Sequence, residues 1–176
     1  MYGVNENVVY PGHGVARIER IIEKRIGNRI ISFYELKLLS KGMTILTPTA
    51  NAEAVGIRPL SSYQEIDNIF KKLMMPARKN RQDHMMATNW NRRNKEYQLK
   101  LRTGSLIDIS EIYHDLLDIA RTKELSFGEK TLLQQTEALL AEEISAVHKL
   151  EGEKALEHLR SIFVQRPHHI GGIGLI

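Results

Sequence analysis

The hydrophobic pattern of the chain changes its period once, near Ser62, and this change sets the fold class. Before that residue, short runs rich in β-branched and aromatic residues are separated by glycine-containing turns, as expected for strands. After it, apolar residues recur every three or four positions, which is typical of amphipathic helices. About four or five short strands cannot cover both faces of an open sheet, so closure into a small barrel is favoured. We therefore predict an α+β multidomain chain in which a small β-barrel module precedes an all-α helical domain.

Helix-start signals predict where the domains meet. Ser62 and Ser126 each precede a glutamate by three residues, the spacing of a capping box, and Thr88 or Asn89 can cap a helix between them. The stretch before Thr88 is polar and basic without a clear period, which is typical of a domain boundary. We expect a β module at 1–60, a connecting helix and basic linker at 61–87, a helical domain at 88–164 and a disordered tail at 165–176.

Composition excludes several classes of protein. Hydrophobic residues make up 42% and charged residues 26% of the 176 residues, close to the averages of folded domains. Because the chain has no cysteine, a disulfide framework, a thiolate zinc site and a cysteine nucleophile are excluded. No apolar run reaches the roughly 18 residues that span a bilayer, and the start does not read as a signal peptide, so we expect a cytoplasmic protein with no membrane partner.

No sequence pattern points to catalysis. The chain contains no GxGxxG, P-loop, GxSxG or HExxH motif, and its acidic residues lack the spacing of paired catalytic carboxylates. His13 stands alone between two glycines, and a turn histidine without a partner is rarely a metal ligand. We therefore expect no enzymatic activity, no cofactor, no metal and no small-molecule substrate.

Positive charge is concentrated in the middle of the chain. The formal net charge is +4, but residues 71–102 hold ten Lys and Arg against only Asp83 and Glu96. A dense positive segment attracts polyanions, and phosphate backbones are the usual partner. The alternative is a solvated basic linker without a ligand.

Trp90, the only tryptophan, lies within this basic segment at the start of a predicted helix. In one interpretation, Trp90, Tyr97 and Leu101 form an apolar stripe that faces the core, and periodicity alone favours this. In the other, the indole is exposed and wedges against a base step while the basic residues that follow it grip the phosphates.

Four motifs together resemble the CarD/CdnL family of bacterial transcription regulators. They are VVYPGHGVARIE at 8–19, NAEAVGIRPL at 51–60, TNWNRR at 88–93 followed by Lys95, and LSFGEKTLL at 125–133. The resemblance covers about residues 5–163 and keeps the order of the motifs. It implies a Tudor-like β module, also found in transcription-repair coupling factors, followed by a helical domain.

The resemblance also implies a function in transcription initiation. Such a protein docks its β module on the lobe of the RNA polymerase β subunit and stabilises the promoter open complex, with its helical domain at the upstream edge of the bubble. The tryptophan wedge of the family falls on Trp90, and the accompanying DNA contacts fall on Arg92, Arg93 and Lys95. The basic linker suggests further phosphate contacts; the candidates are Arg78, Lys79 and Arg81.

The polymerase-facing positions of the family fall on the hairpin around Lys24, Arg25 and Ile26 and on the strand near Leu46. Actinobacterial members have an arginine where this chain has Leu46, so the polar part of the docking contact is expected to differ.

Two other functions remain open at this point. One is a free-standing, nonspecific nucleic-acid-binding protein, which would expose stacking aromatic residues on its strands, whereas Tyr10, Phe33 and Tyr34 lie in strands needed for the core. The other is a protein–protein adaptor that does not contact DNA. In each case we expect a monomer.

Overall fold

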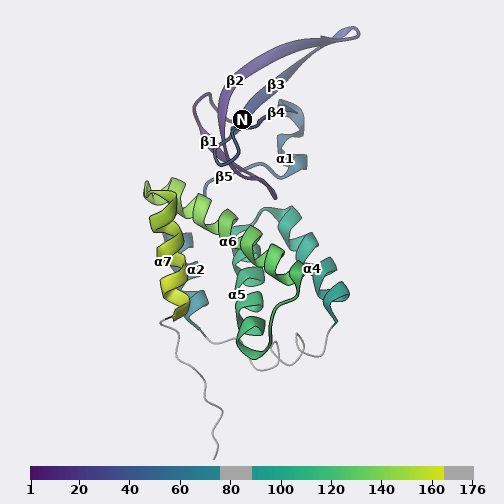
Figure 1. Ribbon diagram of the computed structural model, residues 1–176. Helices are drawn as coiled ribbons and strands as arrows, with labels where there is room; N and C mark the ends of the chain where they lie inside the picture. Colours follow the sequence, from purple (N-terminus) through teal and green to yellow (C-terminus); the bar gives the residue numbers. More distant parts are fainter. Residues whose placement is uncertain (76–88, 165–176) are drawn as a thin grey trace, which may run out of the picture.

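The computed structural model describes residues 1–75 and 89–164. The first part is a five-stranded antiparallel sheet in the order β4-β3-β2-β1-β5, with β4 and β5 at its edges (Figure 1). The short helices η1 (Thr49–Asn51) and α1 (Ala52–Val55) connect β4 with β5. The strands are β1 (Asn7–Tyr10), β2 (Gly14–Ile26), β3 (Arg29–Leu38), β4 (Thr44–Pro48) and β5 (Arg58–Pro59).

Strands β2 and β3 form a long hairpin that projects away from the rest of the molecule (Figure 1). Ile26 pairs with Arg29, so the predicted Gly27–Asn28 turn is confirmed as a two-residue connection, with Gly27 at a φ of 61°. The register shifts between Ile18 and Arg20. Because side chains alternate along a strand, one extra residue reverses which β2 side chains face the core beyond this point.

The β module encloses its own hydrophobic core. Tyr34 is buried there and half-buried Tyr10 packs against it, as expected. Phe33 points to the other side of β3 and is not part of this cluster, so its expected place in the core is wrong. Ala52 and Ile57 bring the segment around α1 onto the same core. The buried residues of this cluster are Val8, Ala16, Ile18, Tyr34, Leu36, Leu38, Ala52 and Ile57.

After β5, every regular element in the described residues is a helix, which confirms the α+β fold class. The predicted capping boxes at Ser62 and Ser126 are both present, and Asn89 caps the helix between them by accepting a hydrogen bond from the Arg92 N–H. Ile112, Leu116 and Leu140 are among its fully buried residues. The helices are α2 (Tyr63–Met74), α4 (Trp90–Thr103), α5 (Leu106–Thr122), α6 (Phe127–His148) and α7 (Gly152–Val164). Within the described residues, no helix is both long and apolar enough to cross a membrane.

The two parts meet where α6 packs against the start of β2. Arg58 of β5 forms an ion pair with Glu143 of α6, with two N–O distances of 2.8 Å, and its Nε donates to the Gly104 carbonyl. Pro11 lies so close to Gly104 that a Cβ there would stand 3.0 Å from the Pro11 ring. Gly104 ends α4, so the β module holds the C-terminal end of the helix that begins with Trp90.

Candidate nucleic-acid interface

Trp90 is the first residue of α4, and its indole is half-buried against the helical core. The indole edge lies on the first turn of α6. A Cβ built on Gly128 would stand 3.0 Å from Cζ2 and 3.3 Å from Cε2 and Nε1 of Trp90. Tyr97 and Leu101 are buried, so the predicted stripe exists. Its first member, however, keeps part of its surface in solvent, and Trp90 has features of both interpretations.

Arg93 lies inside the domain rather than on its surface. Its Nη2 is 2.6 Å from Oε1 of Glu129, and the two side chains are only 7% and 1% exposed. The expected phosphate contact of Arg93 is incompatible with this position, because its guanidinium already neutralises a buried carboxylate. Arg93 instead connects α4 to α6 one turn after Trp90.

Glu129 joins several groups at the start of α6. Its Oε2 accepts hydrogen bonds from the backbone N–H and the hydroxyl of Ser126, and Lys123 approaches Oε1 to 3.3 Å. Burial acts to raise the pKa of Glu129, but the hydrogen bonds from Ser126 and Lys123 outweigh it and hold the pKa below its ordinary value. The carboxylate is therefore ionised at neutral pH, when it pairs with Arg93.

Arg92 and Lys95 are exposed on the side of α4 that faces away from the core. The Arg92 side chain is 69% exposed, and Glu96 lies 3.8 Å from it, too far for a strong ion pair. Both cations are thus available to an anion that passes the N-terminal end of α4, where Trp90 lies. Arg78, Lys79 and Arg81 fall outside the described residues.

Sequence reasoning missed other residues beside Trp90. Phe127, the first residue of α6, is 88% exposed, and its neighbour Gly128 contacts the indole. Lys123 and Lys130, on either side of the Ser126 cap, are 46% and 52% exposed. The only signal for this arrangement was the LSFGEK motif, whose spatial neighbour in α4 could not be read from the sequence.

The hairpin residues expected at the polymerase divide between two faces. Leu46 pairs with Glu35, and alternation along β3 and β2 places Lys24 and Ile26 on the same side as Leu46. Arg25 pairs with Ile30 and lies on the opposite side. The four expected residues therefore do not form one surface, and Arg25 is the exception.

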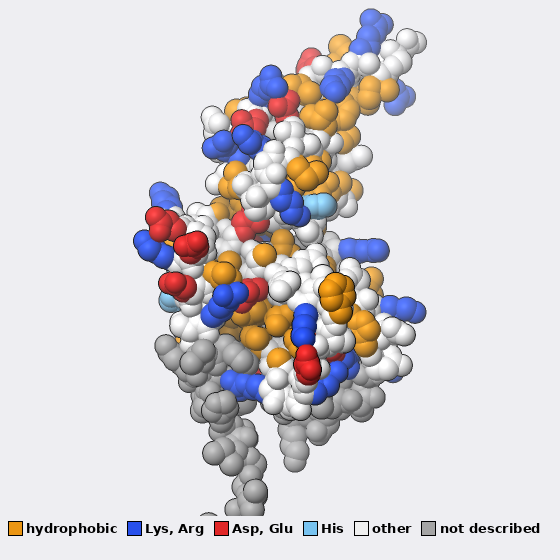
Figure 2. Space-filling view, viewed as in Figure 1, with side chains coloured by type: hydrophobic (Ala, Val, Ile, Leu, Met, Phe, Trp, Pro, Cys, Tyr) orange, Lys and Arg blue, Asp and Glu red, His pale blue; other side chains and the backbone are white. Residues whose placement is uncertain are grey.

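The face that holds Lys24, Ile26 and Leu46, called here the outer face, combines exposed apolar side chains with charged ones. Ile26 is 54% and Leu46 40% exposed, and Ile22 and Phe33 are half-buried between them. Figure 2 shows hydrophobic side chains along the projecting hairpin, interspersed with Lys and Arg. Apolar surface of this kind marks protein-binding sites.

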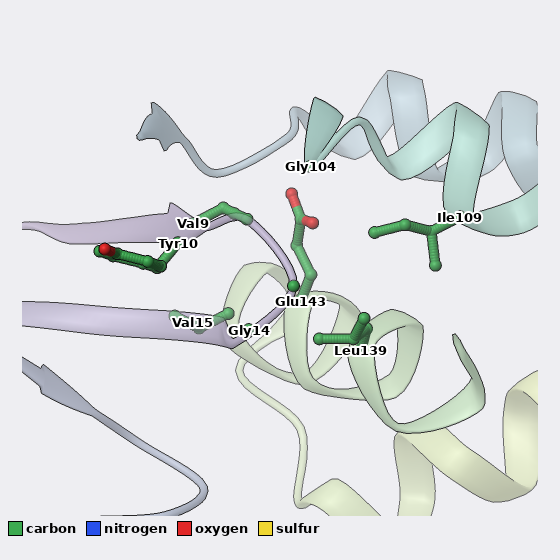
Figure 3. Close-up of a pocket in the computed structure, with 9 residues that line it drawn as sticks. Val9, Tyr10, Gly14, Val15, Gly104, Ile109, Leu139 and Glu143 are labelled. Atoms are coloured by element: carbon green, nitrogen blue, oxygen red, sulfur yellow. The ribbon is translucent and has the colours of Figure 1, made fainter. Parts of the chain in front are cut away.

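The junction between the domains contains a small cavity where β1 and β2 meet the helices. Its volume is about 10 Å³, roughly enough for one water molecule. Figure 3 shows Val9 and Val15 on the β side facing Ile109 and Leu139 on the helical side. In residues 1–75 and 89–164, no group of three or more potential ligands could hold a metal ion.

Both parts of the chain match known families. Residues 2–61 match the CarD-like/TRCF RID domain, and residues 73–160 match the CarD C-terminal domain. A relative in Bacillus subtilis (strain 168), YdeB, named as a candidate transcription factor, is 26% identical over 147 residues, which are 84% of this chain and 92% of YdeB. The chain is also similar to a solved structure, the 72-residue N-terminal domain of Myxococcus xanthus CarD, with 27% identity and a TM-score of 0.30. The match covers 34% of this chain and 79% of the solved chain.

The two matched domains follow one another along the chain in the same order as the β and helical parts of the structure. The first is an RNA polymerase-interacting domain, and CarD regulators are not enzymes. The chain therefore belongs to the CarD family of transcription regulators.

Proposed function

We propose that this protein binds the lobe of the RNA polymerase β subunit through the outer face of its hairpin and stabilises the promoter open complex with Trp90 at the upstream edge of the bubble. The observation that carries the proposal is the position of Trp90. Its indole is partly exposed at the N-terminal end of α4, and the C-terminal end of that helix is held by the β module through Arg58 and Pro11.

The DNA contact needs an aromatic wedge and cations beside it. An indole that inserts at a partly unstacked base step offsets part of an unstacking cost of a few kcal/mol. Arg92 and Lys95 supply exposed charge on α4, and Lys79 and Arg81 stay candidates in the basic linker. About four such phosphate contacts give a slope near −3.6 in a plot of log affinity against log salt concentration.

Stabilisation of the open complex requires a difference in affinity between two states. A protein that gripped closed and open DNA equally would shift no equilibrium. The wedge meets this condition because it finds an unstacked step only at the edge of an open bubble. Slower collapse of the bubble then raises transcription where opening limits the rate and lowers it where promoter escape does.

The contact with polymerase brings the protein to the promoter. The outer face has half-buried Ile22 and Phe33 at its middle, with exposed Ile26 at one end, Leu46 at the other and Lys24 beside Ile26. An apolar middle with charged groups around it is common in protein interfaces. Docking there raises the effective concentration of Trp90 at the promoter, so intrinsic DNA affinity can be weak. One chain carries both surfaces, which is why we expect it to act as a monomer.

One observation argues against a free-standing nucleic-acid binder. In the described strands the aromatic residues, Tyr10, Phe33 and Tyr34, are half-buried or buried rather than exposed as stacking platforms. The adaptor alternative is separated from the wedge by experiment, since it predicts no DNA contact at Trp90.

Site-specific photo-cross-linking tests the proposed placement. A photoreactive residue replaces Trp90 or Leu46 in complexes of the cognate polymerase on promoter DNA. We expect position 90 to cross-link to DNA at the upstream bubble edge and position 46 to the β subunit. Leu150 is the control, because it is 41% exposed but lies beyond the opposite end of α6 from Gly128. Cross-linking of position 90 to protein alone would favour the adaptor.

A further inference from the structure

We propose that Gly128 is a positioning residue that fixes the orientation of the Trp90 indole; the inference rests on the proposed function of Trp90. Gly128 is the second residue of α6 and has no positive φ. In a helix, glycine is about 1 kcal/mol less favourable than alanine. Neither the helix nor its backbone conformation therefore explains a glycine at this position.

The indole explains it. The position that a Cβ would take on Gly128 lies 3.0 Å from Cζ2 of Trp90, closer than an ordinary van der Waals contact. The ring would have to shift by a few tenths of an ångström, and its packing against the core of the helical domain opposes such a shift. Any side chain at 128 would have to displace or rotate the ring.

The neighbouring ion pair keeps this contact in place. Glu129, next to Gly128, pairs with Arg93, which lies one turn after Trp90 in α4. The ion pair thus ties α4 to α6 next to the contact between Trp90 and Gly128. A ring held in one orientation before DNA arrives loses less conformational freedom when it inserts.

Trp90 is the only tryptophan of the chain, so its fluorescence reports directly on the contact between the indole and Gly128. We expect Gly128→Ala to change the emission maximum and the anisotropy of Trp90 while the circular dichroism of the helices is retained. Gly152→Ala is the matched control, because Gly152 is also a helix-start glycine, and a Cβ there meets nothing within 4 Å. The control should leave the Trp90 emission unchanged.

The functional readout is the lifetime of promoter open complexes formed by the cognate polymerase. Gly128→Ala should reduce the lifetime extension by at least about twofold, the weaker end of coupling between residues in contact. Gly152→Ala should not reduce it. In a Trp90→Phe background, where the smaller ring leaves room for a methyl group, Gly128→Ala should have little further effect. An equal loss in both backgrounds would mean a merely structural role for Gly128 and would overturn the inference.

The same set of variants separates this inference from the proposed function. If Trp90→Ala extends the lifetime as the unaltered protein does, the wedge itself is wrong. If Trp90→Ala loses the extension but Gly128→Ala keeps both the native emission and the native lifetime, only the role of Gly128 is wrong. A changed emission with a native lifetime would also overturn the positioning role.

Discussion

The guanidinium of Arg58 and the carboxylate of Glu143 face one another across the domain junction, with both N–O distances at 2.8 Å. The Glu143 side chain is only 3% exposed, and Oε1 also accepts a hydrogen bond from the Ser61 N–H. Such a bidentate pair fixes direction as well as distance. It sets the β module, and with it the hairpin, relative to the helices.

Loss of this pair should destabilise the protein. Glu143→Gln leaves the Arg58 guanidinium without its counter-charge at a largely buried site, and we expect the free energy of unfolding to fall by about 2 to 4 kcal/mol. Urea unfolding measures the change. Glu19→Gln is the control, because the ion pair of Glu19 with Arg17 is exposed to solvent and should contribute little to stability. Equal losses in the two variants would contradict the role of Arg58 and Glu143.

Substitutions in the turn before β2 test how closely α6 packs against the β module. Gly12 and Gly14 both have positive φ, of 72° and 98°, so alanine is strained at either position. A Cβ on Gly14 would collide with the Glu142 carboxylate, whereas one on Gly12 meets nothing within 4 Å. We expect Gly14→Ala to lower the thermal midpoint more than Gly12→Ala. A larger loss for Gly12→Ala would mean that α6 does not pack closely on this turn.

Glu142 should make stability depend on pH. Burial at the junction raises the pKa of Glu142 above its ordinary value of 4.5, despite hydrogen bonds from Ser40 and Val15. A raised pKa in the folded state gives stability that is present below the unfolded pKa and is lost as pH rises through the folded pKa. Relative to Glu142→Gln, the unaltered protein should therefore lose stability as pH rises from 4.5 towards neutrality. Chemical unfolding of both proteins across this pH range measures the difference in their stability. If this difference stayed constant, or grew as the pH fell, the raised pKa of Glu142 would be wrong.

Arg92 and Arg93 should behave in opposite ways despite being adjacent. Arg93→Gln removes the partner of buried Glu129 and should cost about 3 to 5 kcal/mol of folding free energy. Arg92→Gln should change stability by less than about 0.5 kcal/mol, because the Arg92 side chain is exposed. It should instead reduce the salt slope of DNA-dependent activity by about one contact. Unfolding curves measure the stability of the two variants, and salt titrations measure the slope. A large loss of stability in Arg92→Gln with none in Arg93→Gln would contradict these positions.

The two faces of the hairpin predict which substitutions impair polymerase binding. Ile26→Asp and Leu46→Asp place charge among the apolar side chains of the outer face, and we expect the affinity for polymerase to fall by about tenfold or more. Ile30→Asp is the control, because Ile30 is 70% exposed but faces the other side with Arg25. Binding to surface-immobilised polymerase measures the affinity of each variant. If Ile30→Asp lowered the affinity most, the outer face would not be the docking surface.

Local signals predicted much of the fold. The capping boxes at Ser62 and Ser126, the Asn89 cap and the Gly27–Asn28 turn each depend on residues within a few positions of one another, and all are present. The order of a β module and a helical domain followed from the period of the apolar residues alone.

Features that depend on distant contacts could not be predicted in this way. Arg93 looked like a surface cation because its partner, Glu129, is 36 residues away along the chain. Arg25 looked equivalent to Lys24 because alternation within a strand does not reveal which face docks. The contact between Trp90 and Gly128 could not be predicted either, because it exists only once α4 and α6 lie side by side.

The most direct test of the account is the lifetime of promoter open complexes with no addition, with the protein, and with a folded Trp90→Ala variant, each at saturating polymerase binding. We expect a longer lifetime with the protein, and a loss of that extension with the variant although it still binds polymerase. An unchanged lifetime with the bound, intact protein would contradict the wedge mechanism.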